Sequence, residues 1–273
     1  MKPSLEPVEN PAGGVTLKKK AWPQQLLLTL TLITGVATFF NPTSENTNRD
    51  ALLLLLATAS SLAVPVRQLP LQSVLLAAFV IALIGGAAHG LSVRTGLPFG
   101  PLIFGATAGP KLFSTVPPVM PLLWIIAIFN SRGVARLMLR PWRRVKNYGF
   151  LLMGLTVALA LAFDFALEPF AHGKHLWRWQ PTILTVTWYG ATPLSFLAWA
   201  FVALLILALI MPYLIRKQPG NPSAPDFAPL ALWLGAIVLF AVNSAHASQW
   251  AAVILDAAIA GVAAIYSWLG ARW

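Results

Sequence analysis

The chain has 273 residues, of which 58% are hydrophobic and only 10% are charged, and its mean hydropathy is +0.72. Apolar runs recur along almost the whole length, and a water-soluble protein of this size could not bury so many of them, so the composition predicts a polytopic membrane protein. The net charge of +11 does not indicate a nucleic-acid-binding protein, because the basic residues lie mostly in short loops and form no basic-aromatic face, and the absence of cysteine excludes disulfides, thiolate nucleophiles and Cys-ligated metal clusters.

The first residues, 1–23, are rich in proline, glycine and charge, and we expect a disordered cytoplasmic tail before a single transmembrane domain over 24–273. The basic stretch Lys18–Lys20 could also rest against anionic lipid. The apolar run 24–40 is longer than the apolar region of a secretory signal, and no small-residue cleavage site follows it. We therefore interpret this run as an uncleaved anchor.

A transmembrane helix needs about 20 apolar residues, and on this rule the chain predicts an all-α transmembrane helix bundle of about eight spans. The spans are expected near 24–40, 50–66, 71–91, 117–130, 149–167, 193–215, 227–243 and 250–269. The fourth run could extend to Arg136. Residues 92–116 combine Pro98, Pro101, Pro110 and several glycines with apolar side chains, which predicts a re-entrant or partly buried irregular segment rather than a regular helix.

Lys and Arg residues are unevenly divided between the two sides of such a bundle. Most of the 19 fall on the side of the two termini. The other side receives only Arg49, Arg94, Lys111, Lys174 and Arg178. Because basic loops stay in the cytoplasm, we expect both termini to lie there, with the protein in a bacterial inner membrane.

Two carboxylates, Asp164 and Glu168, end an apolar run, and charge at membrane depth is costly enough to suggest a functional site. If the helix continues to Glu168, the two side chains lie on one face, one turn apart. Two carboxyls this close in a low-dielectric site cannot both ionise easily, so one remains available as a general acid. The alternative is that both pair with Lys174 or Arg178 at the membrane surface.

Aromatic residues surround these carboxylates in the sequence. They are Phe163, Phe165, Phe170, Trp177, Trp179, Trp188, Tyr189, Phe196 and Trp199. Their ring faces could stabilise a cationic intermediate. Taken alone, however, they fit an interfacial aromatic belt better, since such belts occur in many unrelated membrane proteins.

The four histidines are too few for the clustered imidazoles of a membrane di-iron enzyme. A single site made of histidine and carboxylate stays open, with His172 and His175 as its closest pair. We interpret these two as interfacial loop residues. His89 lies in the small-residue stretch Gly86–Gly90, so we interpret it as a packing residue.

Asp256 falls near the centre of the last predicted span, where an unpaired charge costs about 3 kcal/mol or more. We expect it to face the bundle interior. It could be a second catalytic carboxyl, a protonated hydrogen-bonding group, or the partner of an arginine or of His246; the structural roles are favoured.

Several short motifs follow one another along residues 90–210. They read TGLPFG (Thr95–Gly100), GP (Gly109–Pro110), PLLW (Pro121–Trp124), FDFALEP (Phe163–Pro169), WRW (Trp177–Trp179) and YGATPLSFLAW (Tyr189–Trp199). Together they resemble the integral-membrane carotenoid biosynthesis protein family, which includes the carotenoid hydratases of γ-carotene and bacterioruberin pathways. No single motif would carry this resemblance.

The chain departs from the family pattern at several positions. Phe163, Phe165 and Glu168 stand where the family usually has Trp, Leu and an Asp before Pro, so both carboxylates persist in type. Other differences are Ser195 for Asn, Ala198 for Gly, and Leu102 and Phe104 for Tyr. These departures leave open another substrate, a different reaction on an isoprenoid lipid, or lost catalysis.

The resemblance implies a hydro-lyase that hydrates a terminal carbon-carbon double bond of a linear carotenoid or other isoprenoid dissolved in the bilayer. It implies Asp164 and Glu168 as the acid-base pair and no redox cofactor or metal. It further implies a substrate pocket formed by Phe99, Trp124, Trp177, Trp179, Tyr189, Phe196 and Trp199, with Asp256, Arg178 and His172 as possible support. Other pathway enzymes could be partners. A membrane transporter and a non-catalytic isoprenoid-lipid-binding protein are the alternative functions.

Overall fold

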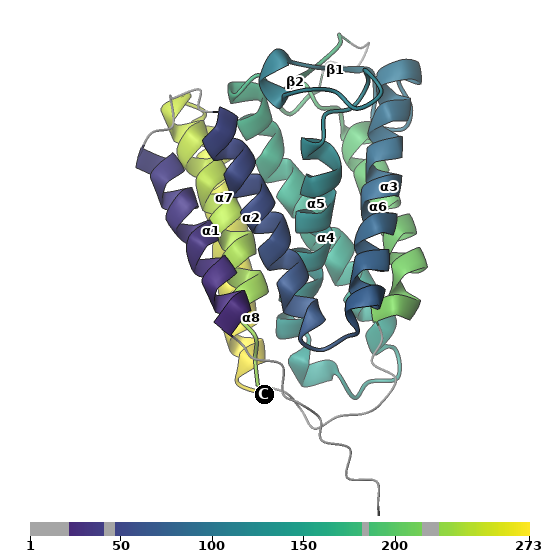
Figure 1. Cartoon of the computed structure of the whole chain (residues 1–273), viewed down its shortest axis with the longest axis vertical. Helices are drawn as coiled ribbons and strands as arrows, with labels where there is room; N and C mark the ends of the chain where they lie inside the picture. Colours follow the sequence, from purple (N-terminus) through teal and green to yellow (C-terminus); the bar gives the residue numbers. More distant parts are fainter. Residues whose placement is uncertain (1–21, 41–46, 182–185, 215–223) are drawn as a thin grey trace, which may run out of the picture.

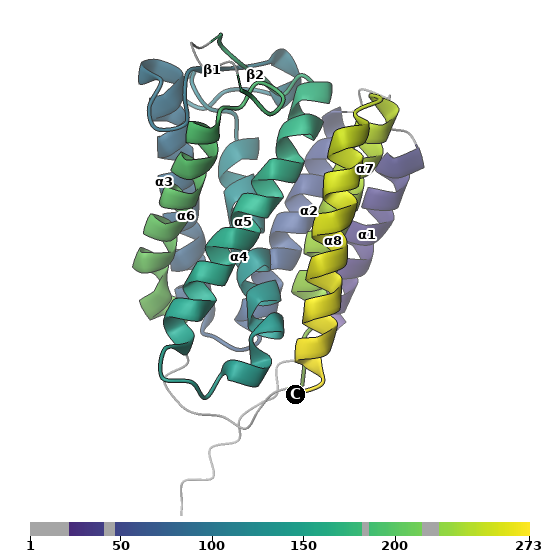
Figure 2. The same ribbon diagram turned by 180° about the vertical axis from the view of Figure 1, so that it is seen from behind.

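The computed structural model of the protein describes residues 22–40, 47–181, 186–214 and 224–273. Within these ranges, eight long helices run side by side along a common axis (Figures 1 and 2). The helices are α1 (Trp22–Phe40), α2 (Thr47–Val66), α3 (Leu71–Thr95), α4 (Val119–Met138), α5 (Tyr148–Gly173), α6 (Pro193–Leu214), α7 (Ala228–His246) and α8 (Trp250–Ala271). This arrangement confirms the predicted all-α bundle.

Seven of these helices, α2 to α8, are long and apolar enough to cross a membrane, and the protein is an integral membrane protein. Their outer faces carry large apolar side chains, such as Phe150 at 75% exposure and Phe201 at 64%. Such faces fit lipid rather than water. Helix α1 is not among the seven, although it has 19 residues and packs against α2 and α7.

The predicted boundaries differ from the observed ones mainly where helices continue into less apolar sequence. Helix α3 extends to Thr95 instead of 91, α4 to Met138 instead of 130, and α5 to Gly173 instead of 167. The extra turns contain charged, glycine or proline residues. A rule based on hydropathy ends the span before such residues, but in the folded protein the helix continues through them. The predicted tail, 1–23, lies outside the described residues except for Trp22 and Pro23, which begin α1.

Helix α4 forms the centre of the bundle. It packs against α2, α3, α5, α7 and α8. Of the residues in its most apolar segment, 72% are buried. Polar side chains join it to its neighbours: Asn130 Nδ2 donates to Ser61 Oγ at 2.8 Å, and Trp233 Nε1 donates to Ser131 Oγ at 3.2 Å. Interhelical hydrogen bonds of this kind help to fix the arrangement of helices in a membrane, where apolar burial between helices gives little driving force.

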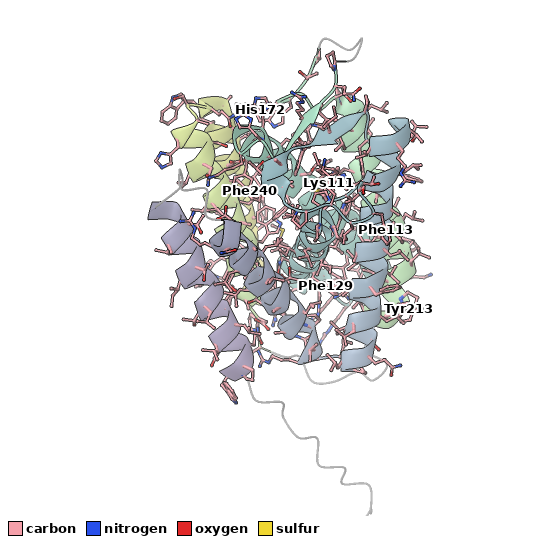
Figure 3. All side chains as sticks on the ribbon, turned by 45° about the horizontal axis from the view of Figure 1, so that its top comes forward. Lys111, Phe113, Phe129, His172, Tyr213 and Phe240 are labelled. Atoms are coloured by element: carbon pink, nitrogen blue, oxygen red, sulfur yellow. The ribbon has the colours of Figure 1, made fainter. Side chains whose placement is uncertain are left out.

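One end of the bundle is covered by segments that are far apart in the sequence. Strand β1 (Leu102–Phe104) pairs antiparallel with β2 (Trp177–Trp179), so that Phe104 lies opposite Trp177. A short 3₁₀ helix, η1 (Ala106–Ala108), follows β1. Lys111 and Phe113, labelled in Figure 3, lie in the connection between η1 and α4. Residues 96–116 are thus irregular and partly buried, as predicted, whereas residues 92–95 belong to α3. A second 3₁₀ helix, η2 (Arg140–Trp142), lies at the opposite end.

Replacement of Gly133 by alanine should lower the stability of the bundle. A Cβ atom at Gly133 would lie 2.3 Å from Pro229 Cβ of α7, so the two helices would have to separate. Overpacking of this kind typically costs 1–3 kcal/mol, that is about 2 kcal/mol here. Thermal unfolding in detergent micelles measures the change.

Gly154→Ala is the matched control, because no atom lies within 4 Å of the added Cβ atom on that part of α5. Alanine also has a higher helix propensity than glycine. Equal melting temperatures for the two variants would contradict the close α4–α7 contact.

Candidate active site

Helix α5 places Asp164 and Glu168 on one buried face, one turn apart. The two residues are only 1% and 3% exposed, and their carboxyls are close enough to interact electrostatically. The predicted carboxylate pair therefore forms, and it lies inside the bundle rather than at its surface. Asp164 Oδ1 is buried and has no hydrogen-bond partner among the described residues.

The helix reaches Glu168 and continues through Pro169, although proline has no N–H to donate to the carbonyl one turn earlier. That carbonyl belongs to Phe165, and it accepts a hydrogen bond from Trp188 Nε1 at 3.0 Å. A side chain from the connection before α6 thus replaces the missing backbone donor. Trp188 allows α5 to carry both carboxylates on regular helix.

Strand β2 covers the Glu168 carboxylate with two indoles. Trp177 Nε1 and Trp179 Nε1 both donate to Glu168 Oε2, at 3.2 and 3.0 Å. Side chains alternate along a strand, so Arg178 lies on the other face and is exposed. Two N–H donors stabilise the ionised form of Glu168, and Arg178 does not neutralise it.

A cluster of rings lies beside these indoles, and we call it the His89 cluster: His89, Phe99, Phe104, Trp124 and Trp199. The rings of Trp124 and Trp199 stack with centroids 3.6 Å apart, and the His89 ring lies 4.5 Å from that of Phe99. Phe104 joins the cluster to Trp177 through an edge-to-face contact at 6.3 Å. The aromatic surface is therefore continuous from His89 to the tryptophans that hold Glu168.

His89 is the polar member of this cluster, and neither of its ring nitrogens has a hydrogen-bond partner among the described residues. The sequence interpretation of His89 as a packing residue did not anticipate these surroundings. The sequence gives little indication of these neighbours, since it shows only that His89 lies among small residues. The partners that surround it come from α4, α6 and the connection after α3.

Gly85 explains how Trp124 comes so close to α3. A Cβ atom at Gly85 would lie 2.4 Å from Trp124 Cγ, inside van der Waals contact. Gly85, directly before the small-residue stretch of α3, thus makes room for an indole ring.

The remaining predicted pocket residues divide into two groups. Phe196 is buried and stacks on Phe165, with ring centroids 3.9 Å apart. Tyr189 instead lies near His172, with ring centroids 5.8 Å apart, on the side of α8. His172 lies near the capped end of the bundle (Figure 3). The structure therefore does not bring Tyr189 or His172 into the His89 cluster.

Asp256 faces the bundle interior, as predicted, and is 1% exposed. It lies within the first two turns of α8 rather than near the centre of the span, because α8 begins at Trp250. Neither carboxyl oxygen has a hydrogen-bond partner among the described residues. Burial and the negative charge of the Asp256 carboxyl raise the pKa of Tyr189.

His172 and His175 are both exposed. Within the ranges that the structure describes, no group of three or more His, Asp or Glu side chains could hold a metal ion.

A model of the family described as carotenoid biosynthesis protein matches residues 49–263. This chain belongs to the carotenoid biosynthesis protein family. The matched region runs from α2 into α8 and contains the carboxylate pair, the His89 cluster and Asp256. No curated protein and no solved structure matches the chain. The family resemblance of the sequence motifs is thus confirmed, and it supports a role in carotenoid biosynthesis.

Gly85→Ala should disrupt the His89 cluster. The added Cβ atom displaces Trp124 and breaks its stack with Trp199, at a cost of about 1–3 kcal/mol. Near-ultraviolet circular dichroism reports the loss of the stacked indoles, and thermal unfolding reports the stability.

Gly86→Ala is the control at the neighbouring position, because its Cβ atom would lie 3.8 Å from Pro121 Cβ, which is an ordinary van der Waals contact. An unchanged circular dichroism spectrum for Gly85→Ala would show that Trp124 does not lie over this glycine.

Proposed function

We propose that this protein hydrates a terminal carbon-carbon double bond of a linear carotenoid dissolved in the membrane. The observation that carries the proposal is the buried pair Asp164 and Glu168 beside a continuous aromatic surface. Family membership supplies the substrate class, and the side chains supply an acid, a base and rings that stabilise a cation.

Asp164 is the proposed general acid. Its Oδ1 atom has no donor to stabilise a charge, whereas Glu168 accepts two indole N–H groups, so a proton shared by the pair favours Asp164. Asp164 gives this proton to the less substituted carbon of the double bond. The π electrons form the new C–H bond and leave a tertiary cation on the other carbon.

Glu168 is the proposed base. Water attacks the tertiary cation, and the carboxylate accepts one proton of that water as the C–O bond forms. A proton then returns from Glu168 to Asp164, which restores the starting state. The net reaction adds one water and changes no oxidation state of the enzyme, so the cycle closes without a reductant or oxidant.

The aromatic rings are proposed to stabilise the cation. Trp177 and Trp179 keep their N–H edges on Glu168, and Phe104 joins Trp177 to the other rings of the His89 cluster. A cation over an aromatic face gains about 2 kcal/mol when water is excluded. Phe165 and Phe196 add a second stack beside Asp164 on the α5–α6 contact.

The proposed setting is the cytoplasmic membrane of a bacterium, with both termini in the cytoplasm. Exposed basic residues around η2, including Arg143, Arg144 and Lys146, support this orientation. The capped end with the carboxylates then faces away from the cytoplasm. A linear carotenoid would reach the site from the bilayer, and enzymes that make such polyenes are the expected pathway partners.

Expression of the chain in a bacterium that accumulates linear carotenoids should give a pigment heavier by one water. Glu168→Gln and Asp164→Asn should each reduce its formation by at least about 100-fold, because general acid-base catalysis contributes 10²–10⁴-fold. Chromatography with mass spectrometry measures the pigment, and immunoblotting of membranes verifies the protein.

Asp50→Asn is the matched carboxylate control, since Asp50 is half exposed at the start of α2. An unchanged pigment profile with the wild-type protein present in the membrane would reject hydration of these substrates. Polyene that copurifies with the protein but is not converted would instead support a binding protein.

His89 is proposed to hold the attacking water through a ring nitrogen, because both nitrogens are buried and free of protein partners among the described residues. His89→Phe should therefore lower product formation about 10-fold or more while polyene binding persists, which is the loss expected for one misplaced reactant. Pigment yield and polyene retention on the purified protein are measured together. Equal yields from His89→Phe and wild type would remove this role.

A further inference from the structure

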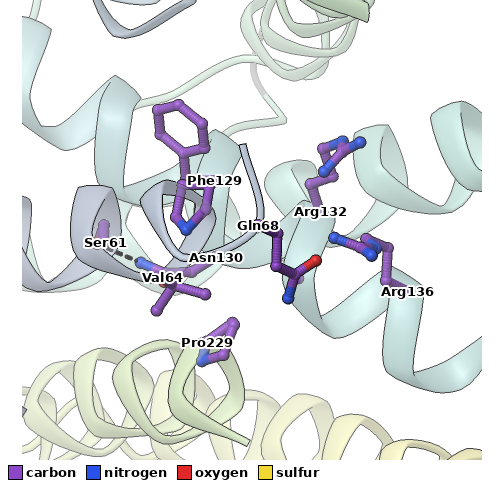
Figure 4. Close-up of a pocket in the computed structure, with 10 residues that line it drawn as sticks. Ser61, Val64, Gln68, Phe129, Asn130, Arg132, Arg136 and Pro229 are labelled. Carbon is purple, nitrogen blue, oxygen red and sulfur yellow. Dashed lines mark hydrogen bonds between the residues drawn. The ribbon is translucent and has the colours of Figure 1, made fainter. Parts of the chain in front are cut away.

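A pocket lies at the opposite end of the bundle from the carboxylate pair, between α2, the last turns of α4 and the start of α7 (Figure 4). The pocket is small and partly open to the surroundings. Polar groups enter it from Gln68, Asn130, Arg132 and Arg136. The carboxylate chemistry proposed above uses none of these residues.

Arg132 is the unusual member of this pocket, because it is an arginine at only 8% exposure inside a transmembrane bundle. Its Nη2 atom donates to the carbonyl of Leu214 at 2.9 Å, at the end of α6. Its Nε atom is buried without a hydrogen-bond partner among the described residues. The hydrogen bond to the end of α6 therefore uses only part of the hydrogen-bonding capacity of the guanidinium group.

Arg136 lies one turn further along α4 and lines the same pocket. Figure 4 shows both arginines and Gln68 on one side of the pocket, with the Arg136 guanidinium group next to the Gln68 side chain in this view. No acidic residue lines the pocket, and neither arginine forms an ion pair among the described residues. The carboxylate of Asp226, just before the start of α7, lies 3.6 Å from Arg67.

Two like charges held together at the edge of an apolar bundle repel each other and lose hydration, and an anion between them offsets both effects. Arginine guanidinium groups match a phosphate geometrically, because their N–H groups form parallel hydrogen bonds to its oxygens. The other pocket walls, Val64, Phe129 and Pro229, are apolar and suit the hydrocarbon part of a lipid.

We propose that this pocket binds the phosphate of an anionic phospholipid from the leaflet at this end of the bundle. Arg132 and Arg136 hold the phosphate oxygens, and Gln68 contacts the headgroup. Basic pockets between transmembrane helices are known to bind lipid headgroups in this way. The bound lipid would join α2, α4 and α7 at the end where α4 leaves the bundle.

The test uses the full-length protein in nanodiscs of phosphatidylcholine alone or with phosphatidylglycerol, and measures the melting temperature. Phosphatidylglycerol should raise it by roughly 3 °C or more, since a ligand that binds only the folded state stabilises it. Arg132→Gln and Arg136→Gln should each remove most of this shift. Arg136 is exposed, so its variant remains informative if Arg132→Gln does not fold.

Arg143→Gln is the matched control, because Arg143 is an exposed arginine at the same end that does not line the pocket, and it should keep the full shift. An equal shift in Arg136→Gln and wild type would overturn the proposal, as would no difference between the two lipid compositions. An equal shift from inorganic phosphate in phosphatidylcholine nanodiscs would assign the pocket to a free anion instead and overturn the lipid assignment. None of these outcomes depends on hydration activity.

Discussion

The site depends on the cost of burying a carboxylate at membrane depth. Glu168 meets that cost with the indole N–H groups of Trp177 and Trp179, which strand β2 places at 3.2 and 3.0 Å. Strand β2 is in turn held by β1, and Gly105 N donates to the carbonyl of Leu176 at 2.9 Å. The cap, the carboxylate and the end of α5 are therefore linked, and the irregular connection after α3 contributes β1 to this arrangement.

The bundle distributes its polar and aromatic groups in a way that suits a hydrophobic substrate. Apolar side chains such as Phe150 and Phe201 face outward, while Asp164, Glu168 and His89 are inside with the largest rings. On the proposed function, a polyene would enter from the lipid, and the polar groups that could handle water and protons would be these few buried side chains. This arrangement fits membership of the carotenoid biosynthesis protein family.

The sequence predicted the helices well, because an apolar run of sufficient length has few alternatives in a bilayer. It also predicted that Asp164 and Glu168 share a face, but not that α5 continues past Pro169, because the donor that replaces the proline N–H is Trp188, in a later connection. The pairing of β1 with β2 involves strands of only three residues and leaves no periodic signal. The sequence interpreted His89 as a packing residue and gave no sign of its aromatic neighbours, because these come from other elements.

The most direct test of acid-base hydration is isotope labelling, which shows where the oxygen and the hydrogen of the product come from. The purified protein is incubated with a linear carotenoid in H₂¹⁸O and, separately, in D₂O, and the product is analysed by mass spectrometry and NMR. The account predicts ¹⁸O in a tertiary hydroxyl group and one non-exchangeable deuterium on the adjacent carbon, with no label from O₂. Oxygen derived from O₂, or a hydroxylated product without deuterium at that carbon, would contradict proton transfer from the carboxylate pair.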